Sequence, residues 1–230
     1  MYEVKLDGVS CLKLKILPTR RPDIPAPKRK YEQITIPGRS GSLVETDGSY
    51  ESIIIPVEFG FISPPEKWNT TFRSAKKWLS GKGKLQFSDD EDFFYLCQNC
   101  EITGTERTVK EIGKFTAEFL CDPYMYAVSG DTALEDYRTF ENNYMESHPK
   151  YEVEGNGDCT LTVNGKNMKM VVNGQITIDT ELMIAYNRDM VSQNNLLSGE
   201  YEDLYLKEGR NVIDITEGFT LEVFPRWRCL

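Results

Sequence analysis

Apolar and polar residues alternate along most of this chain, which is the pattern of strands that bury one face. Val4 and Leu6 begin the alternation, and Leu12–Ile16 continues it. A long apolar run at Glu51–Phe61 is rich in β-branched residues, which favour strands. We therefore expect the first half to be mainly β, with further strands at Tyr31–Ile36, Leu43–Thr46, Lys84–Phe87, Phe93–Cys100, Glu101–Lys110 and Lys114–Cys121.

One segment of the first half has helical periodicity instead. Its apolar residues recur every three or four positions and form one stripe: Trp68, Phe72, Ala75 and Leu79. Ser63 is suited to cap the amino-terminal end with its hydroxyl group, and Pro64 and Pro65 fit the first turn that would follow it. Gly81 is suited to a left-handed cap at the other end. The pattern predicts one helix over about residues 64–80.

The second half shows only the strand pattern. Two Asn-Gly pairs, Asn164-Gly165 and Asn173-Gly174, fit two-residue type I′ turns, which need positive φ at both positions. The spacing of the strands is typical of a β-sandwich. The segment 122–150 has few apolar residues and is expected to connect the two halves. The predicted strands are Cys159–Val163, Lys166–Val172, Gln175–Asp179, Ile184–Tyr186, Tyr205–Leu206, Asn211–Ile215 and Phe219–Phe224.

Charge also divides the chain. The net charge is −9 over 230 residues; residues 1–124 hold 18 basic and 18 acidic side chains, so the whole excess lies in residues 125–230. This step predicts two domains, 1–130 and 131–230. An acidic chain argues against nucleic acid as the main partner. The amino terminus is charged, so no signal peptide is expected, and no apolar run reaches the ~20 residues of a membrane span.

The residues that most often carry chemistry form no catalytic or metal constellation. Cys97 and Cys100 have CxxC spacing but lie in a predicted strand, without the further ligands of a zinc site. The six cysteines are scattered, which favours buried thiols over disulfides. His148 is expected to be a solvated loop residue, and the acidic turn Asp89–Asp92 lacks the calcium-loop pattern. We expect no enzyme, cofactor or metal site.

Two neighbouring segments are more suggestive. Pro18–Lys30 contains four prolines and five basic residues against one Asp, which predicts an extended arm. The loop Ile36–Leu43 is glycine-rich but lacks the Lys and hydroxyl residue of a phosphate loop. The arm is either a solvated loop or a docking element for an acidic surface, such as that of a second copy. The candidate interface residues are Arg20, Arg21, Lys28, Arg29, Lys30, Gly38, Arg39 and Gly41.

Several short motifs occur in a distinctive order along the chain. They are Ile36–Gly41, Trp78–Leu85, Phe115–Pro123, His148–Gly157, Gly199–Tyr201, Leu204–Leu206 and Gly209–Ile213. In these motifs and their order, the chain resembles the distal tail proteins (Dit) of long-tailed, siphovirus-type bacteriophages and prophages.

The resemblance implies an amino-terminal β-sandwich or split-barrel-like domain with one helix, followed by a galectin-like β-sandwich. It implies a homo-hexameric ring built from the amino-terminal domains, located in the virion tail tip and assembled in the bacterial cytoplasm. Such a ring joins the tail tube protein to the tail-associated fibre or lysin protein and, in many phages, to receptor-binding proteins. Its lumen lets DNA pass. The chain lacks the long insertions that carry carbohydrate-binding modules in enlarged relatives.

Two other functions remain open. A carbohydrate-binding module is one, because aromatic residues such as Tyr186, Tyr201 and Trp227 could stack on sugar rings. A hydrolase is the other, because 36 acidic residues leave room for an unrecognised carboxylate pair.

Overall fold

The chain folds into two compact β units. The computed structural model describes residues 2–230, and one unit extends to Met125 and includes Leu230, whereas the other is Tyr126–Cys229. The boundary predicted from the sequence lies slightly further along the chain. Within the described residues the fold is mainly β with one α-helix, which confirms the predicted class. No helix among these residues has the length and apolarity that crossing a membrane requires.

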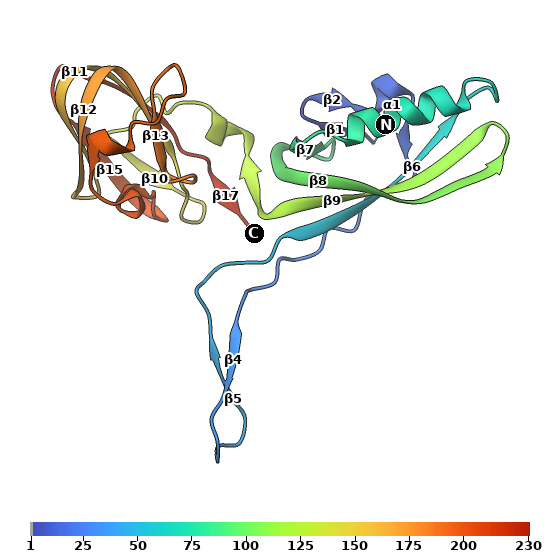
Figure 1. Ribbon diagram of the computed structural model, residues 1–230, viewed down its shortest axis with the longest axis horizontal. Coiled ribbons are helices and arrows are strands. Elements are labelled where there is room, and N and C mark those ends of the chain that lie inside the picture. The colour runs from blue at the N-terminus through green and yellow to red at the C-terminus, as the bar shows by residue number, and fades with distance from the viewer. Residues whose placement is uncertain (1) are drawn as a thin grey trace. The chain divides into compact units, whose positions relative to one another are not determined.

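The first unit is built on one antiparallel sheet (Figure 1). Along its path the strands follow the order β2-β1-β7-β8-β9-β6-β3. In strand β6, alternate residues from Ile53 to Phe61 are buried, so the period of two in the sequence corresponds to a buried face. The strands are β1 (Val4–Leu6), β2 (Val9–Ser10), β3 (Leu17–Pro18), β6 (Ile53–Ile62), β7 (Gly83–Phe87), β8 (Asp90–Val109) and β9 (Ile112–Ala127).

Helix α1 (Trp68–Leu79) packs its predicted apolar stripe into the core of this unit. The ring of Trp68 lies 5.3 Å from that of Phe61, and Phe72 lies 5.6 Å from Phe115, measured between centroids. The predicted Ser63 cap was wrong, because the helix begins at Trp68 without a side-chain cap. Pro65 disfavours helical geometry at the residue before it, so the chain makes a separate turn first.

Three other boundaries in the first unit differ from the predictions. Gly81 is not in the left-handed conformation, and Ser80 ends the helix in the right-handed region. Cys11–Leu14 form a 3₁₀ turn rather than a strand, because the Ser10 hydroxyl accepts the Leu12 N–H and Lys15 turns the chain at φ 61°. The strands predicted on either side of Cys100 are one continuous strand, β8.

The second unit is organised by one long hairpin. Strands β11 and β12 pair along their full length, from Lys150↔Asp179 to Val163↔Lys166. The first part of β11 also pairs with β16, and its last part pairs with β15, so the hairpin is the centre of the seven-stranded sheet. The strands are β10 (Thr139–Asn142), β11 (Lys150–Val163), β12 (Lys166–Asp179), β13 (Ile184–Tyr186), β14 (Leu197–Ser198), β15 (Gly209–Ile215), β16 (Thr220–Phe224) and β17 (Arg228–Cys229).

Only one of the two Asn-Gly pairs is a turn. Asn164 and Gly165 both have positive φ and connect β11 to β12, as predicted. Asn173-Gly174 lies inside β12, so the prediction of a second turn was wrong. Gly174 pairs with Gly155, and both have positive φ, which places a bend in the two strands where no side chain obstructs it.

The segment 122–150 is more structured than predicted. It contains the end of β9 and the whole of β10, which pairs with β15 through Thr139↔Val212 and its neighbours. Ser147 forms an isolated bridge to Leu206, and this bridge replaces the strand predicted at Tyr205–Leu206. Because this segment has few apolar residues, the sequence did not predict that it contains the edge strand β10.

A buried ion pair stabilises the turn after β12. The two terminal guanidinium nitrogens of Arg226 donate to the Asp179 carboxylate, at 2.8 and 2.6 Å. Burial raises the pKa of Asp179, but the hydrogen bonds and charge of Arg226 outweigh it and leave the pKa below its ordinary value of 3.8. A carboxylate with a lowered folded-state pKa stabilises the fold above its unfolded pKa, and this stabilisation is lost as the pH falls through the folded value.

We therefore expect Asp179→Asn to lower the free energy of unfolding by roughly 3 kcal/mol at pH 7, because it leaves the half-buried Arg226 charge unpaired. The deficit should begin to shrink below about pH 4, where Asp179 of the unfolded wild-type chain takes up a proton, and it should disappear as the pH falls through the lower folded-state pKa. Urea unfolding at pH 7, 5 and 3 measures this. Asp158→Asn, at an exposed position of β11, is the matched control; equal losses in the two variants at pH 7 would contradict the role of the ion pair.

Candidate functional site

An exposed hairpin extends from the first unit between β3 and β6 (Figure 1). Strands β4 (Glu32–Thr35) and β5 (Ser42–Glu45) pair with each other and form a separate two-stranded sheet. Every residue from Lys28 to Gly48 is exposed. We call Lys28–Glu51 the arm; it shares only residues 28–30 with the extended segment predicted at Pro18–Lys30. An isolated two-stranded hairpin is only marginally stable in water, so the arm has the properties of an element that gains stability from a partner.

The base of the arm is fixed to the sheet. The Glu51 N–H donates to the Lys28 carbonyl at 2.8 Å, which closes the hairpin. The Arg29 guanidinium donates to the Tyr50 hydroxyl at 3.2 Å and lies over the Tyr50 ring. Tyr50 in turn packs edge-on against Tyr124 of β9, with ring centroids 5.9 Å apart. The arm is thus anchored at one end and free along the rest.

The tip of the arm is the glycine-rich loop. Gly38 has φ 83° and Gly41 has φ 82°, both in the left-handed region that favours glycine. The Arg39 N–H donates to the Ile36 carbonyl at 3.1 Å, so the loop is a tight reversal between β4 and β5. Arg39 itself is exposed. The loop presents one guanidinium to solvent and does not form a phosphate cradle.

The arm also presents apolar side chains. Ile34 and Leu43 are paired across the two strands, and both lie on the face that includes Ile36. Leu43 is 44% exposed, and Val44 on the other face is 57% exposed. Exposed apolar groups on a hairpin without a core are typical of an interaction surface.

The predicted interface residues fall into two groups: six lie in the arm, and two precede it. Lys28, Arg29, Lys30, Gly38, Arg39 and Gly41 belong to the arm. Arg20 and Arg21 precede it and make ion pairs within the unit: Arg20 with Asp23 and Glu58, both at 3.2 Å, and Arg21 with Asp89 at 3.3 Å. The basic residues therefore do not form one continuous patch.

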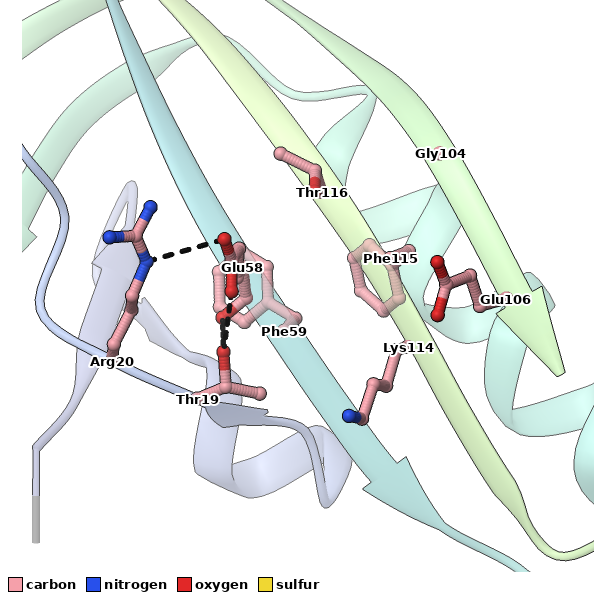
Figure 2. A pocket seen from close by; sticks show the side chains of 9 residues that line it. All are labelled: Thr19, Arg20, Glu58, Phe59, Gly104, Glu106, Lys114, Phe115 and Thr116. Carbon is pink, nitrogen blue, oxygen red and sulfur yellow. Dashed lines mark hydrogen bonds and ion pairs between the residues drawn. The ribbon is translucent and has the colours of Figure 1, made fainter. Parts of the chain in front are cut away.

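Figure 2 shows a cleft of about 480 Å³ on the first unit. Arg20 and Thr19 hold the Glu58 carboxylate on one side, at 3.2 and 3.3 Å. Glu106 and Lys114 line the cleft from β8 and β9, together with Phe115. Oppositely charged groups line the cleft, so it has no net preference for an anion or a cation.

The cleft contains two carboxylates, which is what a hydrolase would require. A general acid needs a carboxyl group that burial or a second carboxylate keeps protonated. Glu58 is paired with Arg20, and Glu106 is exposed. One carboxylate is held in an ion pair and the other is exposed to solvent, so the cleft gives no support to the hydrolase alternative.

The other candidate residues occupy structural positions. Cys97 and Cys100 lie in β8, and all six cysteines are free thiols. Burial and the neighbouring Cys97 raise the pKa of Cys100 to about 12, so its thiolate scarcely forms near neutral pH. In the part of the chain that the structure describes, no group of three or more His, Cys, Asp or Glu side chains could hold a metal ion.

The prediction that His148 is solvated was wrong. Its imidazole stacks on Tyr205 with centroids 3.8 Å apart, and its nitrogens lie 2.7 Å from Glu181 and 2.9 Å from Arg228. The proline that follows His148 gave no sign of this packing. The residue joins three segments of the second unit, and Arg228, not a nucleophile, faces its Nε2.

The aromatic residues of the carbohydrate-binding alternative are not presented together. Trp227 is buried and stacks on Tyr144, with centroids 6.0 Å apart. The Tyr201 hydroxyl is also buried. Stacking on a sugar requires an exposed ring face, which Trp227 does not offer.

Sequence reasoning missed two features of the arm. Tyr50 anchors it, but nothing in the local sequence distinguishes this tyrosine from others. The apolar pair Ile34 and Leu43 could have been found, because cross-strand partners can be counted outward from the glycine turn once a hairpin is assumed.

Among the comparisons with known proteins, only the comparison of structures gives a match. No protein-family model matches the chain, and no curated protein sequence does. The chain is similar in structure to the Dit protein (gp 19.1) of SPP1, described as a paradigm of the hub adsorption apparatus in phages that infect Gram-positive bacteria. The alignment covers 100% of both chains with a TM-score of 0.66 and 14% identity. At this identity, the similarity establishes that the chain shares the fold of that Dit protein along its whole length.

Proposed function

We propose that this chain is a structural hub of a bacteriophage tail tip. Six copies form a ring through their first units, and the ring joins the tail tube protein to the tail-associated fibre or lysin protein. Receptor-binding proteins attach to the same hub, and DNA passes through its lumen. The protein acts in the virion after assembly in the host cytoplasm, and we assign it no catalytic role.

The observation that carries this proposal is the exposed arm on a full-length Dit-like fold. The hairpin exposes apolar groups and cations along its length but has no core of its own. Docking on a neighbouring copy would remove its apolar groups from water and satisfy the free strand edges. A contact between an arm and a different surface of the next copy is head-to-tail, and such contacts close into rings when the rotation allows.

Charge supports the same arrangement. The first unit has equal numbers of basic and acidic groups, so copies of it can pack closely without net repulsion. Within the arm, the cations cluster at the base in Lys28, Arg29 and Lys30 and at the tip in Arg39. Ion pairs from two separated points would fix the register of an apolar contact between them.

Native mass spectrometry of the purified chain tests the proposal directly. We expect a six-subunit species that dissociates on dilution. Electron microscopy of the same sample should show closed rings. A monomer at high concentration, alone and after mixing with the adjoining tail proteins, would overturn the proposal.

Arg39→Glu should raise the dissociation constant of assembly roughly tenfold, because the substitution reverses the charge at the arm tip. The tip is exposed, so the thermal unfolding midpoint should not change. Sedimentation velocity over a dilution series measures the assembly. Arg210→Glu makes the same charge change on the second unit and should leave assembly intact; unchanged assembly in Arg39→Glu would mean that the loop is only a connector.

The apolar face of the arm makes a separate prediction. Ile34→Ser with Leu43→Ser removes a cross-strand pair that docking would bury, at a cost of about 3 kcal/mol in association free energy. Assembly should therefore weaken more than in Arg39→Glu, and added salt should not reproduce the effect. Val171→Ser, at an exposed position of β12, is the control. Wild-type assembly by the double variant would exclude the arm from the interface.

A further inference from the structure

A second exposed apolar surface lies on the other unit, at the edge of its sheet. Strand β13 pairs with the end of β12, and the chain then turns back so that Ser192 bridges Tyr186. Five exposed apolar residues lie in and beside the two turns that flank β13, and we call them the methionine ridge: Leu182, Met183, Ile184, Met190 and Val191. Met190 is 72% exposed. Single exposed apolar residues are ordinary, whereas five of them around one short edge strand favour an interaction surface.

Side-chain hydrogen bonds fix the two turns that carry the ridge. One oxygen of Asp179 accepts the N–H groups of Glu181 and Leu182, each at 3.1 Å. The Asn187 side-chain oxygen accepts those of Asp189 and Val191, at 3.0 and 2.9 Å. The ridge is therefore held in place before any partner binds, which lowers the ordering cost of binding.

Both methionines have strained backbones. Met183 has φ 52° and Met190 has φ 60°, a region that residues with a Cβ rarely adopt. Gly or Asn would relieve this strain in a turn that only faced solvent. A long, adaptable apolar side chain at each position instead favours contact with another surface.

The charges around the ridge define its partner. Residues 126–229 hold 9 basic and 18 acidic side chains, and Asp189 adjoins the ridge, whereas the nearby Glu181 is paired with His148 and Arg228. Arg188 does not offset the charge of Asp189, since its guanidinium is paired with Glu154 at 2.5 Å and bonded to Gln175 at 2.6 Å. A second copy of this acidic unit would be repelled.

From the ridge and its charges, we infer that this surface docks a different protein whose contact surface is apolar at its centre and basic at its rim. The inference extends the proposed hub function, because a hub needs a surface for other proteins besides the one that joins its own copies. The ridge is nevertheless a property of the second unit and does not depend on ring formation.

A fluorescently labelled peptide of alternating Leu and Lys is the probe, with a Leu and Glu peptide of equal length for comparison. Fluorescence anisotropy with the full chain should show saturable binding of the Leu and Lys peptide only. Met190→Gln with Val191→Gln should weaken this binding roughly tenfold. Val212→Gln, at an exposed valine of β15, should leave it unchanged. Circular dichroism establishes that all variants are folded.

Equal binding by the wild type and the ridge variant would overturn the inference, since general acidity would then explain the attraction. Absence of binding by the Leu and Lys peptide would also overturn it. A third peptide, residues 28–48 of this chain, tests a different occupant: if it binds the ridge more tightly than the model peptide, the partner is the arm of a second copy. None of these results depends on the six-subunit species, so the peptide experiment tests the ridge independently of the proposal that the chain forms a ring.

Discussion

The continuity of long antiparallel hairpins is the constraint on which both units depend. Strands β8 and β9 in one unit, and β11 and β12 in the other, are far longer than the five or six residues typical of a strand. Strands of this length cannot stay flat, so they must bend where the layers require it. In the second unit the bend falls at paired Gly155 and Gly174, and a Cβ on Gly155 would lie 2.3 Å from the Phe219 ring. The shorter strands then add to the edges of a hairpin whose shape is already determined.

The arm is built from the same kinds of turn and cross-strand pair as the other hairpins, but it does not pack on a core. Its glycine turn and cross-strand pairs make a hairpin like the others, yet no third strand flanks it in the described chain. The difference lies in burial rather than in hydrogen bonding, because strand pairs gain most of their stability from the face that packs on a core. A chain that retains such an element leaves part of its folding free energy to be supplied by association.

The sequence predicted the class, the helix stripe and most strands, because these depend on local periodicity. The predictions from sequence were wrong where the same local pattern is compatible with two different backbone structures. Asn173-Gly174 has the composition of a turn, but its place opposite Gly155 makes it a bend within a strand. The alternation of Leu12–Ile16 suits a strand, but the Ser10 hydroxyl and the left-handed Lys15 produce a 3₁₀ turn. The six basic candidate interface residues were identified by charge alone, and charge could not show that Arg20 is paired with Glu58 whereas Arg39 lies at a free tip.

The uneven charge of the chain acquires a physical meaning from the two surfaces. The arm carries apolar groups beside four cations and four anions and belongs to a neutral unit, whereas the methionine ridge carries apolar groups on an acidic unit. Apolar burial is not directional and would join either surface to almost any exposed apolar patch. Charge supplies the discrimination, because like charges brought together at a rim oppose association even where the apolar contact is favourable. The proposed hub would pack against its own copies and also hold other proteins, and a net charge confined to one unit would separate these two contacts without any additional structural element.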